Sequence, residues 1–228
     1  MTPSGGLYWH FRALRYRGRL WQPFCAMLQN WLMQWTPPCE GLLLLGASAG
    51  WTLPDDFLKR FEHVHAVDAD PLAPFLFGWN HAKSGAKISF ERVDLFAQLE
   101  DLLERYPHHA ILFSNVLGQR GFHSDDSAAV EAELADLKLR LKGRHWASYH
   151  DRLSLAGPLE PARLSPFTSQ GFVLTQDLVK KIGAAGTCSD HLTGSVLPDN
   201  APRQFLPWQL KPGRLHWVEA GIGTDLNP

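Results

Sequence analysis

Residues 41–51 read GLLLLGASAGW, an apolar run that meets a loop of small residues. The run is apolar at every position, which is typical of a strand that is buried on both faces of a parallel sheet. The loop Gly46-Ala47-Ser48-Ala49-Gly50 has two interpretations. As G-x-S-x-G, it matches a strand-to-helix turn that presents a serine nucleophile. As G-x-x-x-G after a first parallel strand, it predicts a loop whose backbone amides approach a nucleoside cofactor.

The position of this loop in the chain favours the cofactor interpretation. A serine hydrolase places its nucleophile turn after several strands, whereas the strand that leads into Gly46 is the first one predicted in the chain. Pro54 also places the start of the next helix several residues beyond Ser48. Asp151 and His191 follow in the order that a hydrolase triad needs, but such residues arise easily by chance in a chain with 11 His. Hydrolysis by Ser48 is therefore the weaker alternative.

The rest of the chain alternates between strand-like and helix-like segments. The predicted strands are 41–45, 63–67, 88–93, 110–114 and 145–149, and the predicted helices are 52–61, 70–82, 95–106 and 128–141. This alternation predicts an α/β fold with an open, mostly parallel sheet and helices on both faces. Two further strand-like runs, 205–210 and 215–218, flank Lys211-Pro212-Gly213-Arg214 and predict a C-terminal antiparallel hairpin.

An aromatic segment precedes the sheet. Residues 8–35 place Trp, Phe and Leu at helical spacings, with breaks at Gly18 and Pro23, so two helices are predicted. We expect a single domain, because its length is ordinary for one α/β unit. Its expected parts are an aromatic helical cap (1–40), a cofactor-binding core (41–150), and substrate-side loops with the hairpin (151–228).

Composition names no partner class. The formal net charge of −1 argues against a broadly basic nucleic-acid surface. Three scattered cysteines form neither a disulfide framework nor a zinc motif, so we expect a cytoplasmic setting and no metal. Residues 20–35 are too short and too polar to span a bilayer. Residues 9–19 mix aromatics with arginines, and a solvated helix face is favoured over a nucleic-acid contact. These arginines are Arg12, Arg15, Arg17 and Arg19.

The acid that follows the second predicted strand completes the cofactor pattern. Asp68 lies about twenty positions after Gly46, at the end of a strand, where a carboxylate can accept both ribose hydroxyls. A dinucleotide fingerprint would need glycine at Ser48 and Trp51, so a cofactor without phosphates fits better. Four segments carry a resemblance to the class I S-adenosylmethionine-dependent methyltransferases, which are Rossmann-like, over residues 41–150. They are LLLLGASAG, HAVDADP, ISFERVDLF and ILFSNVLGQ.

The resemblance implies a sheet of about seven strands with the last one antiparallel. It implies S-adenosylmethionine as cofactor, S-adenosylhomocysteine as product, and a methyl acceptor that no motif identifies. The residues implied to contact the cofactor are Gly46, Ala47, Ser48 and Gly50 at the amino-acid part, Asp68 at the ribose, Asp94 and Leu95 at the adenine edge, and Asn115 at the methyl group, together with Ala69.

There are two catalytic candidates: Asn115, which the resemblance implies at the methyl group, and His150, which follows from its position in the chain. His150 and Asp151 come directly after the fifth predicted strand, at the ligand-binding edge, so His150 could remove a proton from the acceptor. A hydrogen-bonded structural pair is the favoured interpretation of these two residues. Asp190 and His191 lie in a predicted loop that could close over the site, although a plain surface loop is favoured.

A second class of function stays open. In the family that the chain resembles, an acid is usual at the position of Leu44 and a glycine at that of Ser48. The rival hypothesis is therefore a non-catalytic relative that keeps the fold as a binding or scaffold module.

Overall fold

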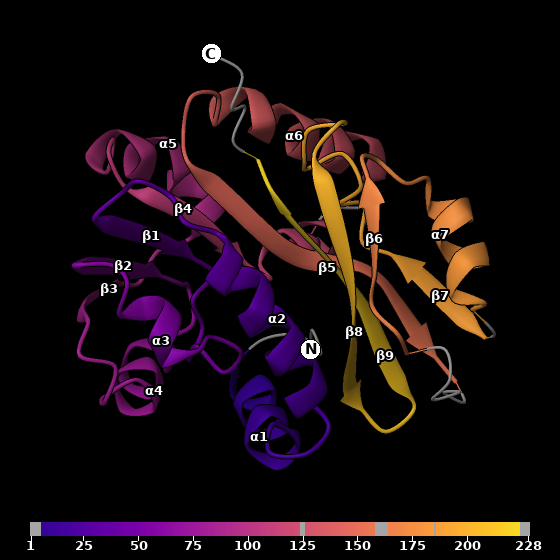
Figure 1. The fold of residues 1–228 in the computed structure, drawn as a ribbon, viewed down its shortest axis with the longest axis horizontal. Coiled ribbons are helices and arrows are strands. Elements are labelled where there is room, and N and C mark those ends of the chain that lie inside the picture. Colours follow the sequence, from indigo (N-terminus) through magenta and orange to yellow (C-terminus); the bar gives the residue numbers. More distant parts are fainter. Residues whose placement is uncertain (1–5, 124–125, 158–163, 185, 224–228) are drawn as a thin grey trace.

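The computed structural model describes residues 6–123, 126–157, 164–184 and 186–223 (Figure 1). The strands are β1 (Gly41–Leu45), β2 (His63–Val67), β3 (Lys87–Glu91), β4 (Ala110–Ser114), β5 (Trp146–Ala156), β6 (Phe167–Gln170), β7 (Thr187–Asp190), β8 (Pro202–Lys211) and β9 (Arg214–Ile222). They form one sheet in the order β3-β2-β1-β4-β5-β9-β8-β6, and β7 pairs with β5 beside that path. Strands β1 to β5 are parallel, whereas β9 is antiparallel to β5 and β8. The predicted Rossmann-like sheet with a C-terminal hairpin is confirmed.

Strand β1 is where the direction of chain progression across the sheet reverses. It pairs with β2 on one side and with β4 on the other, and all five of its residues are buried. Loops that leave the carboxyl ends of such strands turn to opposite sides and leave a crevice between them. The loop that begins at Gly46 lies at this crevice.

Helices cover both faces of the sheet (Figure 1). They are α1 (Gly6–Tyr16), α2 (Gln22–Gln34), α3 (Asp55–Leu58), α4 (Ala73–Asn80), α5 (Leu95–Arg105), α6 (Ser127–Arg140) and α7 (Thr175–Ile182), with a 3₁₀ helix η1 (Leu117–His123). Leu42 and Leu44 of β1 join the core beneath α2, α3 and α4, whereas Leu43 and Leu45 join the core beneath α5 and α6. Two covered faces explain why this strand is apolar throughout.

The two predicted N-terminal helices are present, and they pack on the hairpin end of the sheet. The Phe24 ring stacks on the Trp208 ring of β8 with centroids 4.6 Å apart. The Trp21 indole donates a hydrogen bond to the carbonyl oxygen of Leu210 at 3.0 Å. The N-terminal helices are thus joined to β8, the first strand of the C-terminal hairpin.

The helix expected over residues 52–61 is much shorter than predicted. Only Asp55–Leu58 is helical, and its N-cap residue is Pro54, in extended conformation. The amide of Glu62 bonds to the carbonyl of Glu40 at 2.7 Å, which draws the chain into β2 before another helical turn can form. Thr52, where the helix was expected to begin, lies outside it. Its hydroxyl instead lies 3.0 Å from the Tyr149 hydroxyl.

The sheet has three features that the sequence did not predict, namely a longer β5 and two additional short strands. Strand β5 continues to Ala156, because β7 and β9 both pair with its second half. The short strands β6 and β7 were not expected, since their sequences FTSQ and TCSD are mostly polar and carry no strand pattern. Of these additions, β7 pairs with the carboxyl-terminal half of β5, whereas β6 pairs with β8 at the outer edge of the sheet.

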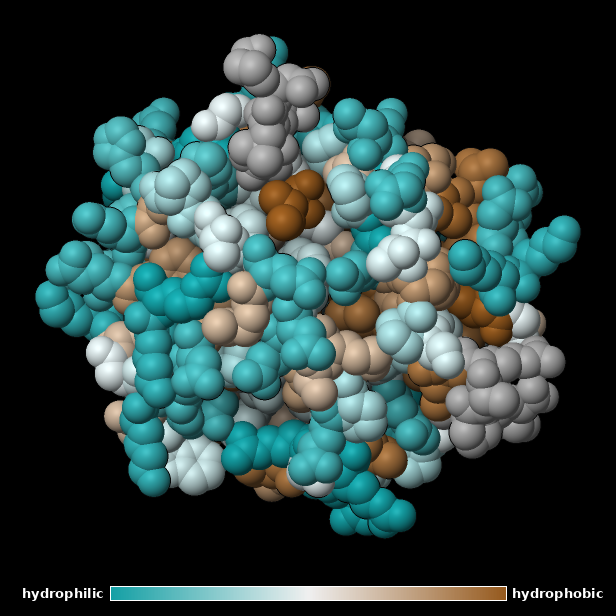
Figure 2. Space-filling model, viewed as in Figure 1, coloured by the Kyte–Doolittle hydropathy of each residue, from teal (hydrophilic) through white to brown (hydrophobic). Residues whose placement is uncertain are grey.

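The surface shows no extended apolar face in the view of Figure 2, where hydrophilic side chains predominate and hydrophobic ones are interspersed. Within the described parts of the chain, no helix combines the length and the apolar character that crossing a membrane requires.

Candidate functional site

A cavity of about 840 Å³ opens at the carboxyl edge of β1, β2 and β4. This volume falls within the usual range for small-molecule sites. Its walls come from the loops after these strands, from β5 and β9, from the 211–214 turn, and from α1. Of the residues predicted to hold a cofactor, those that line it are Gly46, Ala47, Ser48, Asp68, Ala69 and Asn115.

Helix α1 is fixed over the cavity by one histidine. His10 accepts the indole N–H of Trp51 at Nδ1 (3.0 Å), and its Nε2 lies 3.0 Å from the Asp70 carboxylate. Accepting at Nδ1 leaves the proton on Nε2, which then donates to Asp70. Trp51 is too bulky for a loop that binds a pyrophosphate. In this structure its indole instead anchors helix α1 through His10.

The acid after β2 holds the loop after β1. The backbone amide of Ser48 donates to Asp68 Oδ2 at 2.8 Å, and the amide of Asp70 donates to Asp68 Oδ1 at 2.9 Å. Burial raises the pKa of the Asp68 carboxyl, and these two amides only partly offset the effect. Asp68 is thus a poorly solvated acceptor at the cavity wall, and each oxygen keeps a further lone pair for a ligand donor.

The loop amides are used inside the protein. The amides of Gly46 and Ala47 both bond to the carbonyl of Val67, at 2.9 and 3.1 Å, and that of Gly50 bonds to the carbonyl of Ala47 at 2.9 Å. The expectation of an amide cradle is therefore wrong for these residues. What this loop offers a ligand is the close approach of a backbone with small side chains.

Gly50 does not line the cavity, contrary to the expectation from the resemblance. It has a φ of +64°, and a Cβ there would lie 2.1 Å from His81 Nε2. His81 is itself held by Asp55, at 2.6 Å from Nδ1. The glycine is required by packing beneath the loop.

Asp94 and Leu95 also lie outside the cavity lining. Asp94 is the N-cap of α5 and accepts from the amides of Phe96 and Ala97, at 3.0 and 3.4 Å. Leu95 is buried in the core beneath that helix. In this structure these residues begin a helix, and their expected contact with an adenine edge has no support from the geometry.

Asn115 ties the end of β4 to β5. It has a φ of +53°, which asparagine tolerates better than most residues. Its Oδ1 accepts the backbone amide of Asp151 at 2.9 Å, and its Nδ2 donates to Asp151 Oδ2 at 3.4 Å. Nearby, burial raises the pKa of Tyr149 to about 12, so this phenol stays protonated and neutral.

Three further side chains gather at the cavity wall, namely Asp151, His191 and His216. His216 Nδ1 lies 2.9 Å from Asp151 Oδ1. Burial opposes ionisation of Asp151, but the nearby charge of His216 lowers the carboxyl pKa to about 2. Burial lowers the pKa of His191. His216 carried no sequence signal, because it is one polar residue in the strand-like run 215–218.

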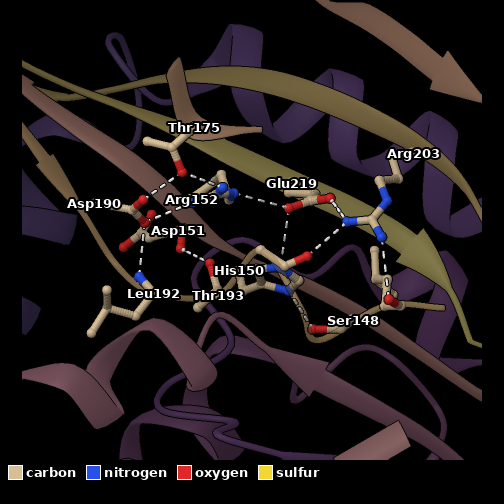
Figure 3. Close-up of polar contacts among 12 residues, drawn as sticks. Ser148, His150, Asp151, Arg152, Thr175, Asp190, Leu192, Thr193, Arg203 and Glu219 are labelled. Atoms are coloured by element: carbon tan, nitrogen blue, oxygen red, sulfur yellow. Dashed lines mark hydrogen bonds and ion pairs between the residues drawn. The ribbon is translucent and has the colours of Figure 1, made fainter. Parts of the chain in front are cut away.

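His150 lies away from the cavity, on the other face of β5 (Figure 3). Residues alternate between the two faces of a strand, so Tyr149 and Asp151 line the cavity while His150 does not. His150 is fully buried, 2.8 Å from the Ser148 hydroxyl and 3.6 Å from the Glu219 carboxylate. Its proposed role as a base therefore conflicts with its position, and the structural interpretation agrees with it.

A buried ionic network on that other face fixes the loop that carries His191. Glu219 pairs with Arg203 and lies 3.7 Å from Arg152 (Figure 3). Arg152 in turn donates to Asp190 at 2.6 Å, and Asp190 accepts the amide of Leu192 at 2.8 Å. His191 is consequently held in place and only 4% exposed, so the expectation of a plain surface loop is wrong.

Ser48 does not lie on a nucleophile turn. Helix α3 begins only at Asp55, so the chain after Ser48 is a loop and not a sharp entry into a helix. Its φ of +46° places it in the left-handed region that favours glycine. The late start of the helix favours a structural role in the loop, because a nucleophile turn leads directly into its helix.

The N-terminal arginines do not share one surface. Arg12 lines the cavity, whereas Arg17 donates to Asn80 at 2.8 Å and lies 4.8 Å from the Trp51 ring centroid. Arg15 lies 5.6 Å from the ring of Tyr16. A nucleic-acid contact through these side chains stays a prediction.

Comparisons with known proteins add a general likeness. No protein-family model matches the chain, and no curated protein matches it. Among solved structures, the N-methyltransferase NodS from Bradyrhizobium japonicum WM9 is 10% identical, with 90% of this chain and 98% of that chain covered at a TM-score of 0.47. Magnesium protoporphyrin IX methyltransferase from Synechocystis PCC 6803, solved with bound S-adenosylmethionine, is 15% identical, with 92% and 82% covered at 0.46.

A third similar structure is an O-methyltransferase described as putative from Nostoc punctiforme PCC 73102, 13% identical, with 94% and 60% covered at a TM-score of 0.44. All three scores are low. The function proposed for this chain therefore rests on its own residues.

Proposed function

We propose that the protein is an S-adenosylmethionine-dependent methyltransferase whose acceptor binds beside Asn115 and Asp151. The observation that carries this proposal is the position of Asp68. This carboxylate ends β2, anchors Ser48 and faces a cavity at the point where the sheet order reverses. An acid at this place is suited to the two hydroxyls of a ribose.

The residues present fit such a cofactor. Asp68 is poorly solvated and keeps lone pairs for ribose hydroxyls, which would relieve the cost of its burial. The small side chains of Ala47 and Ala69 at the cavity wall allow the close approach of a ligand. The cofactor, when bound, supplies an electrophilic methyl group on a sulfonium. The protein then has to align an acceptor and to exclude water.

The acceptor end of the cavity is polar. The residues that line this end are Asn115, Asp151, His191 and His216. Arg12 of α1 also lines the cavity. Methyl transfer by in-line displacement needs alignment first and a proton acceptor only for some substrates. The chemical nature of the acceptor therefore does not follow from the methyl-transfer chemistry alone.

Isothermal titration calorimetry with S-adenosylmethionine and S-adenosylhomocysteine tests this proposal. We expect both ligands to bind at one site per chain, and NAD, which carries a pyrophosphate, to bind much more weakly. No binding of either ligand at millimolar concentration would contradict the proposal and favour the scaffold hypothesis.

The hydrolase alternative has its own test. A fluorophosphonate probe labels activated serines, and we expect no labelling that depends on Ser48. Labelling of the wild-type protein that is lost in Ser48→Ala would overturn the methyltransferase proposal in favour of hydrolysis.

A further inference from the structure

We propose that Asp151, His191 and His216 bind a divalent transition-metal ion of the zinc type at the wall of the cavity. One ligand atom from each residue lies within 4.8 Å of the ligand atoms of the other two. The three residues come from distant parts of the chain, namely β5, the loop after β7, and β9. Two imidazoles and one carboxylate are a donor set that catalytic zinc and non-haem iron sites use.

The contact between His216 and Asp151 has the proximity of an ion pair without the alignment of a hydrogen bond. Nδ1 of His216 and Oδ1 of Asp151 are 2.9 Å apart, yet within the described residues neither atom has a hydrogen-bond partner. Nε2 of His216 has none there either, and the residue is only 8% exposed. A buried imidazole without hydrogen bonds is costly, and a coordinated cation would satisfy it.

Neighbouring groups orient the ligands as they do around known metal sites. His191 Nδ1 lies 3.3 Å from the carbonyl oxygen of Gly118, and only a protonated nitrogen can donate to it. The lone pair of this imidazole is then on Nε2. A histidine that donates one N–H to a carbonyl and binds a metal through the other nitrogen is the usual arrangement.

The carboxylate has equivalent support. Asn115 Nδ2 donates to Asp151 Oδ2 at 3.4 Å, which leaves Oδ1 toward His216. The Thr193 hydroxyl donates to the backbone carbonyl of Asp151 at 2.8 Å and fixes the strand to the His191 loop (Figure 3). Both β5 and this loop are therefore held in position around the cluster.

The charge of the cluster favours a cation. Two neutral imidazoles and one carboxylate carry a net charge of −1, and three protein ligands leave a coordination position for water or an acceptor atom. All three side chains line the cavity, so that position faces the space in which the acceptor is proposed to bind. A metal there could bind a hydroxyl, carboxylate or amine of the acceptor as a Lewis acid.

Metal binding is testable without any activity assay. Untagged protein dialysed against EDTA is titrated with Co²⁺ while the visible absorption bands of four- or five-coordinate cobalt are recorded, and with Zn²⁺ by calorimetry. We expect one equivalent of each ion. The variants His216→Ala and Asp151→Asn should each weaken Zn²⁺ binding on the order of a hundredfold, since each removes a direct ligand.

Controls separate ligation from folding and from the proposed function. His65→Ala removes a histidine that pairs with Glu91 on β2 and β3, outside the cluster, and should keep one equivalent of Zn²⁺. His216→Asn is the second variant if His216→Ala does not fold, as judged by circular dichroism. Sub-stoichiometric uptake by the wild type, or uptake unchanged in both His216 and Asp151 variants, overturns the metal site. S-adenosylhomocysteine binding to the metal-free protein reports separately on the cofactor proposal.

Discussion

The amide of Ser48 donates to the carboxylate of Asp68 at 2.8 Å, and this contact joins the loop after β1 to the end of β2. The side chain that is proposed to hold the ribose is therefore also the anchor of the loop beside it. Since the two residues share one hydrogen bond, changes at them should not act independently.

Asp68→Asn should weaken binding of S-adenosylhomocysteine about tenfold or more, because a ligand hydrogen bond to a poorly solvated carboxylate is lost. The side-chain NH₂ group that replaces one carboxylate oxygen is a donor. The new side chain therefore cannot accept the backbone amides of Ser48 and Asp70 on two separate oxygens. Calorimetry at neutral pH measures the change. Asp56→Asn is the control, because Asp56 is exposed on α3 and forms an ion pair with Lys59 at 3.3 Å, away from the cavity. Equal affinity in both variants would place the cofactor elsewhere.

The sequence correctly predicted those structural features that depend on one segment alone. The apolar run of β1 predicted a strand covered on both faces, and the acid at Asp68 was placed correctly at the end of β2. The role of the other acid that follows a strand was harder to predict. Asp94 follows a strand in the same way, but the start of α5 uses its carboxylate as a cap.

The residues at the acceptor end of the cavity could not be predicted from the sequence pattern of any single segment. His216 reaches Asp151 only because β9 pairs antiparallel with β5, and a register irregularity lies between Asp151 and Leu153. His150 was a candidate because β5 was expected to end at Tyr149. The strand continues, so alternation turns His150 to the opposite face. Long-range pairing, which leaves no trace in either segment, decided both positions.

Ser48→Gly should preserve or raise stability, by up to about 1 kcal/mol, because it removes a side chain from a left-handed backbone position. Ser48→Val at the same position should destabilise by about 1–2 kcal/mol, since a β-branched residue tolerates positive φ poorly. Urea unfolding of the two variants measures the difference. If valine were as stable as glycine, the loop would not hold the backbone conformation described for it.

Gly50→Ala should destabilise the protein by about 2 kcal/mol or more, because its Cβ would lie 2.1 Å from His81 Nε2 at a positive φ. His81 cannot easily move, since it also contacts Asp55. Gly78→Ala is the matched control. That glycine lies in α4 with open space around it, so alanine should stabilise by about 0.5–1 kcal/mol. Thermal unfolding gives both shifts, and shifts of the same sign would contradict the packing described beneath the loop.

Glu219→Gln should lower the free energy of unfolding at pH 7 by about 3 kcal/mol or more, because it leaves buried Arg203 without its charge partner. Burial opposes ionisation of Glu219, but His150 and Arg203 lower its pKa below the usual value of 4.5.

A carboxyl whose pKa is lowered by folding stabilises the protein fully above its unfolded pKa, and that contribution is lost as the pH falls through the folded value. Urea unfolding of the wild type should therefore lose stability as the pH falls below about 4.5, while Glu219→Gln should show a weaker dependence there. Glu100→Gln is the control, because Glu100 is 65% exposed beside Arg140 and should change stability by less than about 0.5 kcal/mol. Identical pH profiles for the wild type and Glu219→Gln would show that the buried network does not hold Glu219 ionised.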